Sequence, residues 1–242
     1  MYSDSSTARD SYGASDMHLD LDQLDRDGAL RETTAGLPRE TRKDFLLGTL
    51  AGGGAALAAL VLAEPGTAAT KTDVAILNYA LTLEYLQAAF YTEAERRRAL
   101  RTAVAKETTR VLGAVERAHV RALRDALGSA AVAKPFFDFG GVTEDEDAFI
   151  KTAVAFEDLG TAAYKGQAYR IGSPALLAAA VSIHSVEARH AAWIRYLAGA
   201  PPASSAFDKP KSMAEVRRLV ASTGFIVQRP RTRSRAEPRF TG

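Results

Sequence analysis

The stretch from Ser173 to Gly199 reads SPALLAAAVSIHSVEARHAAWIRYLAG, and it decides how the rest of the chain is interpreted. Ser173 is suited to cap a helix, Pro174 to begin it and Gly199 to end it. Between these marks apolar residues recur at helical spacing, and Glu187 and His190 lie within that row. Burying two ionisable side chains costs several kcal/mol unless something neutralises them. Because residues three apart lie on one side of a helix, both could reach the same metal ion.

The same pattern occurs once more, and each copy follows a lone glutamate. Glu116 and His119 form the other Glu-x-x-His pair, again within an apolar helical row. Glu84 precedes that pair by 32 residues, and Glu157 precedes Glu187 by 30 residues. The chain therefore contains an internal repeat of Glu followed by Glu-x-x-His. We predict that six side chains bind metal: Glu84, Glu116, His119, Glu157, Glu187 and His190.

The composition of the chain argues against several classes of function. The chain has 242 residues, a formal net charge of +2 and no cysteine. The near balance of charge argues against a general nucleic-acid binder, and we expect no specific nucleic-acid partner. Without cysteine there is no disulfide, thiolate zinc site, iron–sulfur cluster or cysteine nucleophile. Carboxylate and imidazole ligands suit iron or manganese, so we expect two divalent ions, Fe or Mn, as cofactors.

The residues before the repeat divide into two parts. Residues 1–40 are polar and contain few large apolar residues, which predicts a disordered leader. Residues 41–70 begin with the basic wording TRKDFL, continue as an uncharged run over 45–63 and end among small residues. This layout is typical of an export signal. The wording resembles a twin-arginine (Tat) signal in which lysine replaces the second arginine.

The uncharged run leaves two outcomes open. It could be cleaved, or it could stay as a membrane anchor with the basic residues on the cytoplasmic side. We expect the export machinery as a partner and a location in the periplasm or cell envelope. Contact with the membrane is expected only through residues 45–63, if they are not cleaved.

The rest of the chain is predicted to be helical. Apolar spacing predicts four long helices over about 73–98, 102–127, 143–170 and 174–199. Two short links make the joined helices antiparallel, and the long link over 129–142 predicts a crossover along the bundle. The predicted fold is an all-α antiparallel four-helix bundle with one long crossover between helices two and three, plus a short C-terminal helix. The predicted segments are the bundle over 71–199, a C-terminal packing segment over 200–228 and a basic disordered tail over 229–242.

This arrangement resembles the ferritin-like superfamily over about residues 73–199. In that superfamily the glutamates of helices one and three are terminal ligands, which here implies Glu84 and Glu157. The Glu-x-x-His motifs would contribute bridging carboxylates, Glu116 and Glu187, and one imidazole for each metal. The wording LNYALTLEYL (77–86), FEDLG (156–160) and the Tat-like leader are similar to exported ferritin-like proteins often labelled desiccation-related. That subgroup has no settled reaction.

The charge count is consistent with two metals. Four ionised glutamates carry −4 and two divalent ions carry +4, so the loaded site would be neutral. We expect an exported dimetal protein that is redox-active toward oxygen, peroxide or Fe(II), with Glu116 and Glu187 as catalytic residues. Two alternatives stay open: a structural, stress-protective envelope protein, and an iron-binding or storage protein without turnover. We expect a monomer or a small homo-oligomer.

Three further side chains lie near the predicted ligands. Tyr91 and Tyr164 each follow a lone glutamate by seven residues on the same helical face. They could hydrogen-bond to ligands, carry an electron or simply pack in the core. His184 lies on the face of Glu187 and could support a ligand or be an ordinary core histidine.

Overall fold

The computed structural model describes residues 69–228. The predicted polar leader, the uncharged run over 45–63 and the basic tail lie outside the described residues. Within 69–228, no helix combines the length and the apolar character that crossing a membrane requires.

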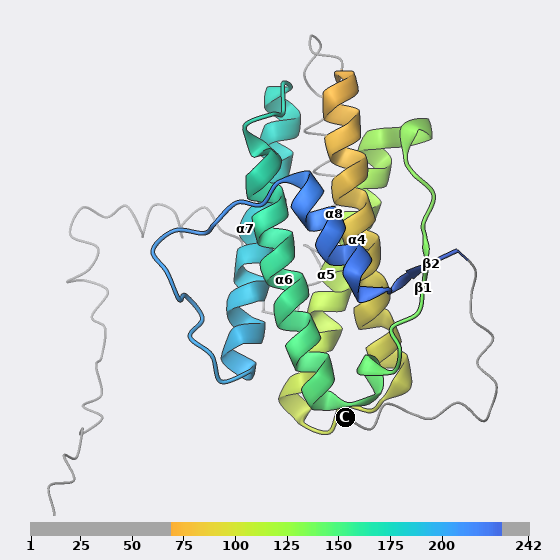
Figure 1. Cartoon of the computed structure of the whole chain (residues 1–242), viewed down its shortest axis with the longest axis vertical. Coiled ribbons are helices and arrows are strands. Elements are labelled where there is room, and N and C mark those ends of the chain that lie inside the picture. The colour runs from red at the N-terminus through yellow and green to blue at the C-terminus, as the bar shows by residue number, and fades with distance from the viewer. Residues whose placement is uncertain (1–68, 229–242) are drawn as a thin grey trace, which may run out of the picture. The chain divides into compact units, whose positions relative to one another are not determined.

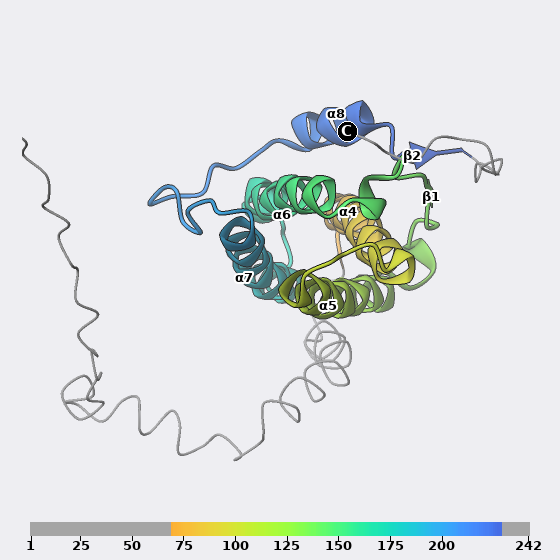
Figure 2. The ribbon, with the colours of Figure 1, turned by 90° about the horizontal axis from the view of Figure 1, so that it is seen from below.

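Four long helices form the body of the described chain. They are α4 (Lys71–Arg97), α5 (Ala103–Leu127), α6 (Glu146–Ala168) and α7 (Pro174–Leu197). The helices α4 and α5 form one antiparallel hairpin, α6 and α7 form another, and the two hairpins lie side by side (Figure 1, Figure 2). The predicted all-α four-helix bundle is therefore confirmed.

The long link between α5 and α6 is the predicted crossover. It contains η1 (Gly128–Ala130), β1 (Phe136–Phe137) and η2 (Val142–Glu144), and it runs along the outside of the bundle from one end to the other (Figure 1). Its length is what allows α6 to begin at the end of the bundle opposite to the end of α5.

The predicted short C-terminal helix is also present. The helix α8 (Met213–Thr223) lies across the outer side of α4 and α6 (Figure 2). After it, β2 (Ile226–Val227) pairs antiparallel with β1, so that Phe137 lies opposite Ile226. The sequence analysis did not predict this pair, because two residues are too few to show the alternation of a strand.

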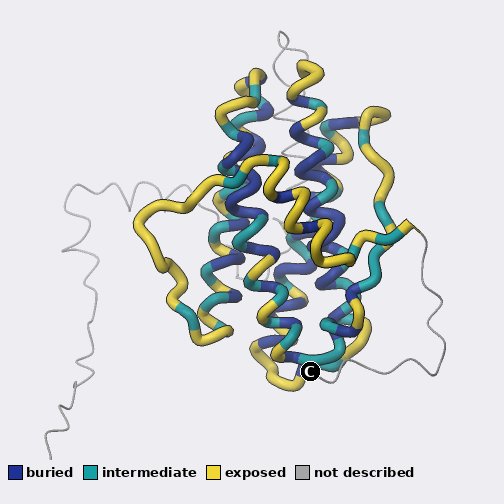
Figure 3. The backbone as a smooth tube through the Cα atoms, in the orientation of Figure 1, coloured by how far each residue is buried: buried dark blue, intermediate teal, exposed yellow. Residues whose placement is uncertain are grey.

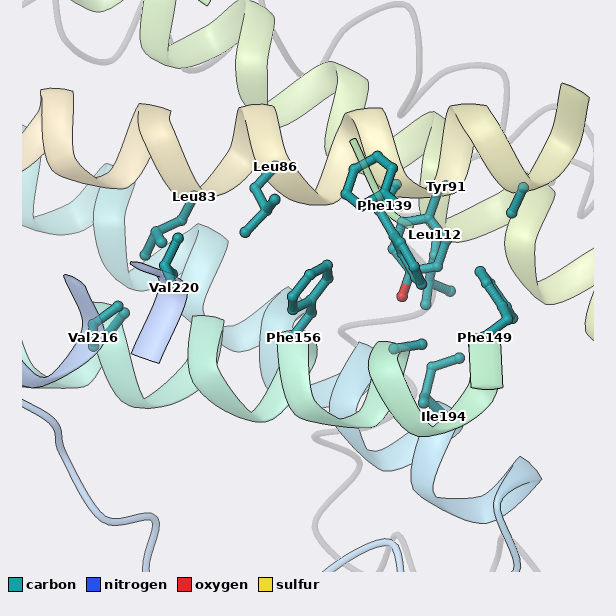
Figure 4. Packing of buried hydrophobic residues seen from close by; sticks show 14 of the residues in the cluster. Leu83, Leu86, Tyr91, Leu112, Phe139, Phe149, Phe156, Ile194, Val216 and Val220 are labelled. Atoms are coloured by element: carbon teal, nitrogen blue, oxygen red, sulfur yellow. The ribbon is translucent and has the colours of Figure 1, made fainter. Parts of the chain in front are cut away.

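Aromatic packing fastens the crossover to the bundle. The fully buried ring of Phe90 stacks on Phe149 with 5.0 Å between centroids, and it meets Phe139 of the crossover edge-on at 5.4 Å. Phe139 in turn contacts Phe225, which follows α8. Figure 4 shows Phe139 and Phe149 between α4 and α6. The link and the C-terminal segment are thus held by the same apolar core.

Two buried carboxylates tie each hairpin to the turn of the other. Asp73 of α4 accepts a hydrogen bond from the Gly172 backbone amide, in the α6–α7 turn, at 2.8 Å. Glu146 of α6 accepts one from the Thr102 hydroxyl, in the α4–α5 turn, at 2.8 Å. These contacts fix the ends of the hairpins relative to each other.

The start of α4 differs from the sequence expectation. The helix was predicted to begin at about residue 73, but Thr70 is the cap and Asp73 is the third helical residue. Each of the two side chains accepts a hydrogen bond from the backbone amide of the other, so the helix starts two residues before the predicted position. Burial alone would raise the pKa of Asp73, but the hydrogen bonds from Thr70, Gly172 and Ser173 outweigh it and lower that pKa.

We expect Asp73→Ala to lower the free energy of unfolding by about 2 kcal/mol, because it removes one partner of the capping box and a charged hydrogen bond between hairpins. Asp125→Ala, on the exposed face of α5, is the matched control and should be nearly neutral. Because the pKa of Asp73 is depressed, its contribution is present above the ordinary value of 3.8 and lost as pH falls below it. Urea unfolding at pH 7 and at about pH 2.5, below the ordinary pKa of Asp73, measures both effects. Equal losses in the two variants would contradict the assigned role.

Candidate metal centre

The six predicted ligands meet in the middle of the bundle. Glu84 comes from α4 and Glu157 from α6. The first Glu-x-x-His pair comes from α5 and the second from α7. All four carboxylates are 0% exposed, and the two imidazoles are at most 8% exposed. Figure 3 shows buried positions distributed along the long helices. The site therefore lies within the apolar core and away from the surface.

The ligand atoms fall into two overlapping groups. Within each group every ligand atom lies within 4.8 Å of the others. One group consists of Glu84, Glu116, His119 and Glu187, and the other of Glu116, Glu157, Glu187 and His190. We call them the His119 position and the His190 position. Two glutamates, Glu116 and Glu187, belong to both positions, so the two groups share part of their ligand set.

Glu116 divides its oxygens between the two positions. Its Oε1 lies 2.8 Å from His190 Nδ1, and its Oε2 lies 3.5 Å from His119 Nδ1. Glu187 Oε1 lies 3.1 Å from His119 Nδ1. The Nδ1 atoms of both rings therefore face the carboxylates.

Several of these buried atoms have no hydrogen-bond partner among the described residues. They include both oxygens of Glu116, Oε1 of Glu187 and Nδ1 of His190. His190 Nδ1 is close to Glu116 Oε1, but the two atoms are not aligned as a hydrogen bond. Buried acceptors without donors are rare in folded proteins, and a cation would satisfy them. The cluster of carboxylates and imidazoles could therefore hold metal ions.

The pKa values show how strongly these groups depend on each other's charge. Burial, followed by the neighbouring Glu116 carboxylate, raises the pKa of Glu84 to about 7, although His119 opposes the shift. Burial also raises the pKa of Glu157. For His119 burial acts to lower the pKa, but the surrounding carboxylates outweigh it and raise that pKa well above its ordinary value. Without cations, the site would keep protons at neutral pH.

Two tyrosines support the lone glutamates in a crosswise manner. Tyr91 of α4 donates a hydrogen bond to Glu157 of α6. Tyr164 of α6 donates one to Glu84 of α4 at 2.5 Å. Of the roles left open by the sequence, hydrogen bonding to the predicted ligands is therefore the one that the geometry gives them.

Gln87 is a site residue that the sequence analysis missed. Its buried side-chain amide donates to Glu157 Oε2 at 3.1 Å and to Glu187 Oε2 at 3.4 Å. It lies three residues after Glu84, so its position on the same helical face could have indicated it. His184 belongs to neither position, and burial lowers its pKa.

The comparison with known families agrees with this architecture. A family model described as a ferritin-like domain matches residues 72–200, which is more than half of the chain. The chain belongs to this family of ferritin-like domains. None of the curated proteins compared with the chain matches it in sequence.

We expect Tyr91→Phe and Tyr164→Phe each to destabilise the metal-free protein by about 1 to 3 kcal/mol, because a buried carboxyl oxygen loses its hydrogen-bond donor. The matched control is Tyr79→Phe, since the buried Tyr79 hydroxyl has no hydrogen-bond partner among the described residues. Thermal unfolding of the three variants in chelator measures the difference. A loss in Tyr79→Phe as large as in the other two would contradict the role of these hydrogen bonds.

Proposed function

We propose that this chain, as a member of the ferritin-like domain family, binds two divalent ions of iron or manganese and acts as a non-haem dimetal oxidoreductase. The observation that carries the proposal is that Glu116 and Glu187 belong to both groups of ligand atoms. A single metal site does not need two shared carboxylates, and a purely structural core would not bury four of them.

The proposed roles follow the position of each side chain. Glu116 and Glu187 would bridge the two ions, as the division of the Glu116 oxygens between the two histidines suggests. Glu84 and Glu157 would be terminal ligands, each held in orientation by a tyrosine hydroxyl. His119 and His190 would bind one ion each through Nδ1.

The chain's own residues would control what reaches the site. When bound, the ions would supply electron transfer with oxygen, peroxide or Fe(II). Phe90, Phe149 and Phe156 pack against one another beside Tyr91 and keep water from that end of the bundle. The four carboxylates would neutralise the charge of two divalent ions. In the metal-free protein, groups with raised pKa values such as Glu84 would hold protons, and these would leave when the ions bind.

The principal test compares two conservative substitutions on α5. We expect wild type to bind two ions per chain and to turn over peroxide or Fe(II). Glu116→Gln should lose about 100-fold or more in metal affinity, and turnover should fall with it. Glu107→Gln is the control, because Glu107 is exposed and pairs with Arg110. Elemental analysis and steady-state assays give both readouts.

Proton release provides a second readout of the same binding. Because the pKa of Glu84 is about 7, adding Mn(II) to metal-free protein should release more protons at pH 6 than at pH 8.5.

Metal binding without turnover would favour storage or stress protection over an enzyme. Unchanged metal content in Glu116→Gln would overturn the dimetal assignment itself.

We also propose that the protein is exported and is related to the desiccation-related ferritin-like proteins. The support is the TRKDFL wording, the uncharged run over 45–63 and the resemblance over 77–86 and 156–160. Replacing Arg42 and Lys43 with glutamine should leave the protein in the cytoplasm. Fractionation followed by N-terminal sequencing of the mature chain checks this, and an unchanged distribution would contradict export through this signal.

A further inference from the structure

The candidate metal centre has an approximate two-fold repeat that fails at one place. Each half contributes a lone glutamate, a tyrosine seven residues later and a Glu-x-x-His pair. Three residues after the lone glutamate, however, the first half has Gln87 and the second half has Gly160. The two metal positions therefore have different surroundings, although their ligand types are the same.

Glycine at position 160 makes room for the amide of Gln87. A methyl group on Gly160 would lie 3.0 Å from Glu187 Oε2 and 3.4 Å from Gln87 Oε1. The side chain of Gln87 thus crosses from α4 toward α6 and fills the space beside the missing side chain. In this place its Nε2 reaches two carboxylates at once.

Both oxygens that Gln87 contacts are on the side of the His190 position. Glu157 belongs to that position alone, and its Oε2 lies 3.6 Å from His190 Nδ1. Glu187 turns its Oε1 toward His119, which leaves Oε2 as its oxygen for the other ion. Of the three carboxylates in the His190 position, two therefore accept from Gln87.

The His119 position has no equivalent donor among the described residues. The oxygens near its imidazole are Glu84 Oε2, Glu116 Oε2 and Glu187 Oε1, at 3.1 to 3.5 Å from His119 Nδ1. None of the three accepts a hydrogen bond from Gln87. The tyrosine bonds do not distinguish the positions, because each terminal glutamate has one.

We propose that Gln87 is a positioning residue that makes the two metal positions inequivalent, so that the His119 position binds a divalent ion more tightly and fills first. The inference rests on the proposed dimetal function. A neutral donor withdraws negative charge from a carboxylate oxygen and occupies one of its lone pairs, which weakens that oxygen as a ligand. A charged hydrogen bond of this kind corresponds to about tenfold in affinity.

The test is a titration of metal-free protein with Mn(II) under argon, followed by calorimetry and electron paramagnetic resonance. Wild type should bind two ions in steps about tenfold or more apart. Glu84→Gln should weaken the first step, and Glu157→Gln should weaken the second, which assigns each step to a position.

Two variants change the second step in opposite directions. Gln87→Leu keeps the volume but removes both donors, so the second step should tighten by up to about tenfold and move closer to the first. Gly160→Ala should displace Glu187 Oε2 and weaken the second step further, with the first unchanged. Gln167→Leu is the control, because Gln167 is a buried α6 glutamine outside both positions. Gly160→Ala keeps the test decisive if Gln87→Leu does not fold.

The results separate this inference from the proposed function. Absence of Mn(II) binding by wild type would overturn the dimetal function and, with it, the inequivalence. Binding of two ions with a single affinity, or identical steps in wild type, Gln87→Leu and Gly160→Ala, would overturn the inequivalence and leave the dimetal function standing. Reversal of the steps assigned by Glu84→Gln and Glu157→Gln would overturn the proposed order.

Discussion

Four carboxylates meet where no water reaches them, and the remainder of the structure depends on how their charge is balanced. Each is fully buried, and the raised pKa of Glu84 and of Glu157 shows that ionisation at this place is costly. Cations or protons must therefore accompany them. With cations, all four can stay ionised as ligands. With protons alone, the same groups repel one another less, and a protonated carboxyl group can also donate a hydrogen bond to a neighbouring oxygen.

The two hairpins are joined by contacts that cross between them at three levels. Near one end, Asp73 of α4 holds the α6–α7 turn. At the other end, Glu146 of α6 holds the α4–α5 turn. In the middle, Tyr91 and Tyr164 each reach across to a glutamate of the opposite hairpin. The candidate metal centre is thus one of the layers that hold the hairpins together, so its charge balance affects both stability and chemistry.

The sequence predicted the helices and the six candidate ligands because both are periodic signals. A glutamate on an apolar helical face is conspicuous, and Glu-x-x-His repeats at a fixed spacing. The start of α4 was predicted two residues late because several neighbouring residues there are suited to cap a helix, and the sequence does not show that the Asp73 side chain also contacts Gly172. Gln87 was missed because a polar residue near a helix face is ordinary until the glycine opposite it is known to be its neighbour. The crosswise tyrosine contacts depend on the register between helices, which spacing within one helix does not determine.

The inequivalence inferred for Gln87 bears on how the two ions would depend on each other. With one divalent ion bound, four ionised glutamates leave a net charge of −2, so the second ion is still attracted strongly. The shared carboxylates act in the opposite direction. Each ion withdraws electron density from Glu116 and Glu187, which makes these carboxylates weaker ligands for the other ion. Gln87 further weakens the carboxylate ligands, and it does so on the His190 side alone. One ion would then be held as part of the structure while the other is held less tightly. A pair of this kind suits either redox cycling or the uptake of Fe(II), and which of the two occurs depends on how fast the weaker ion leaves relative to its oxidation.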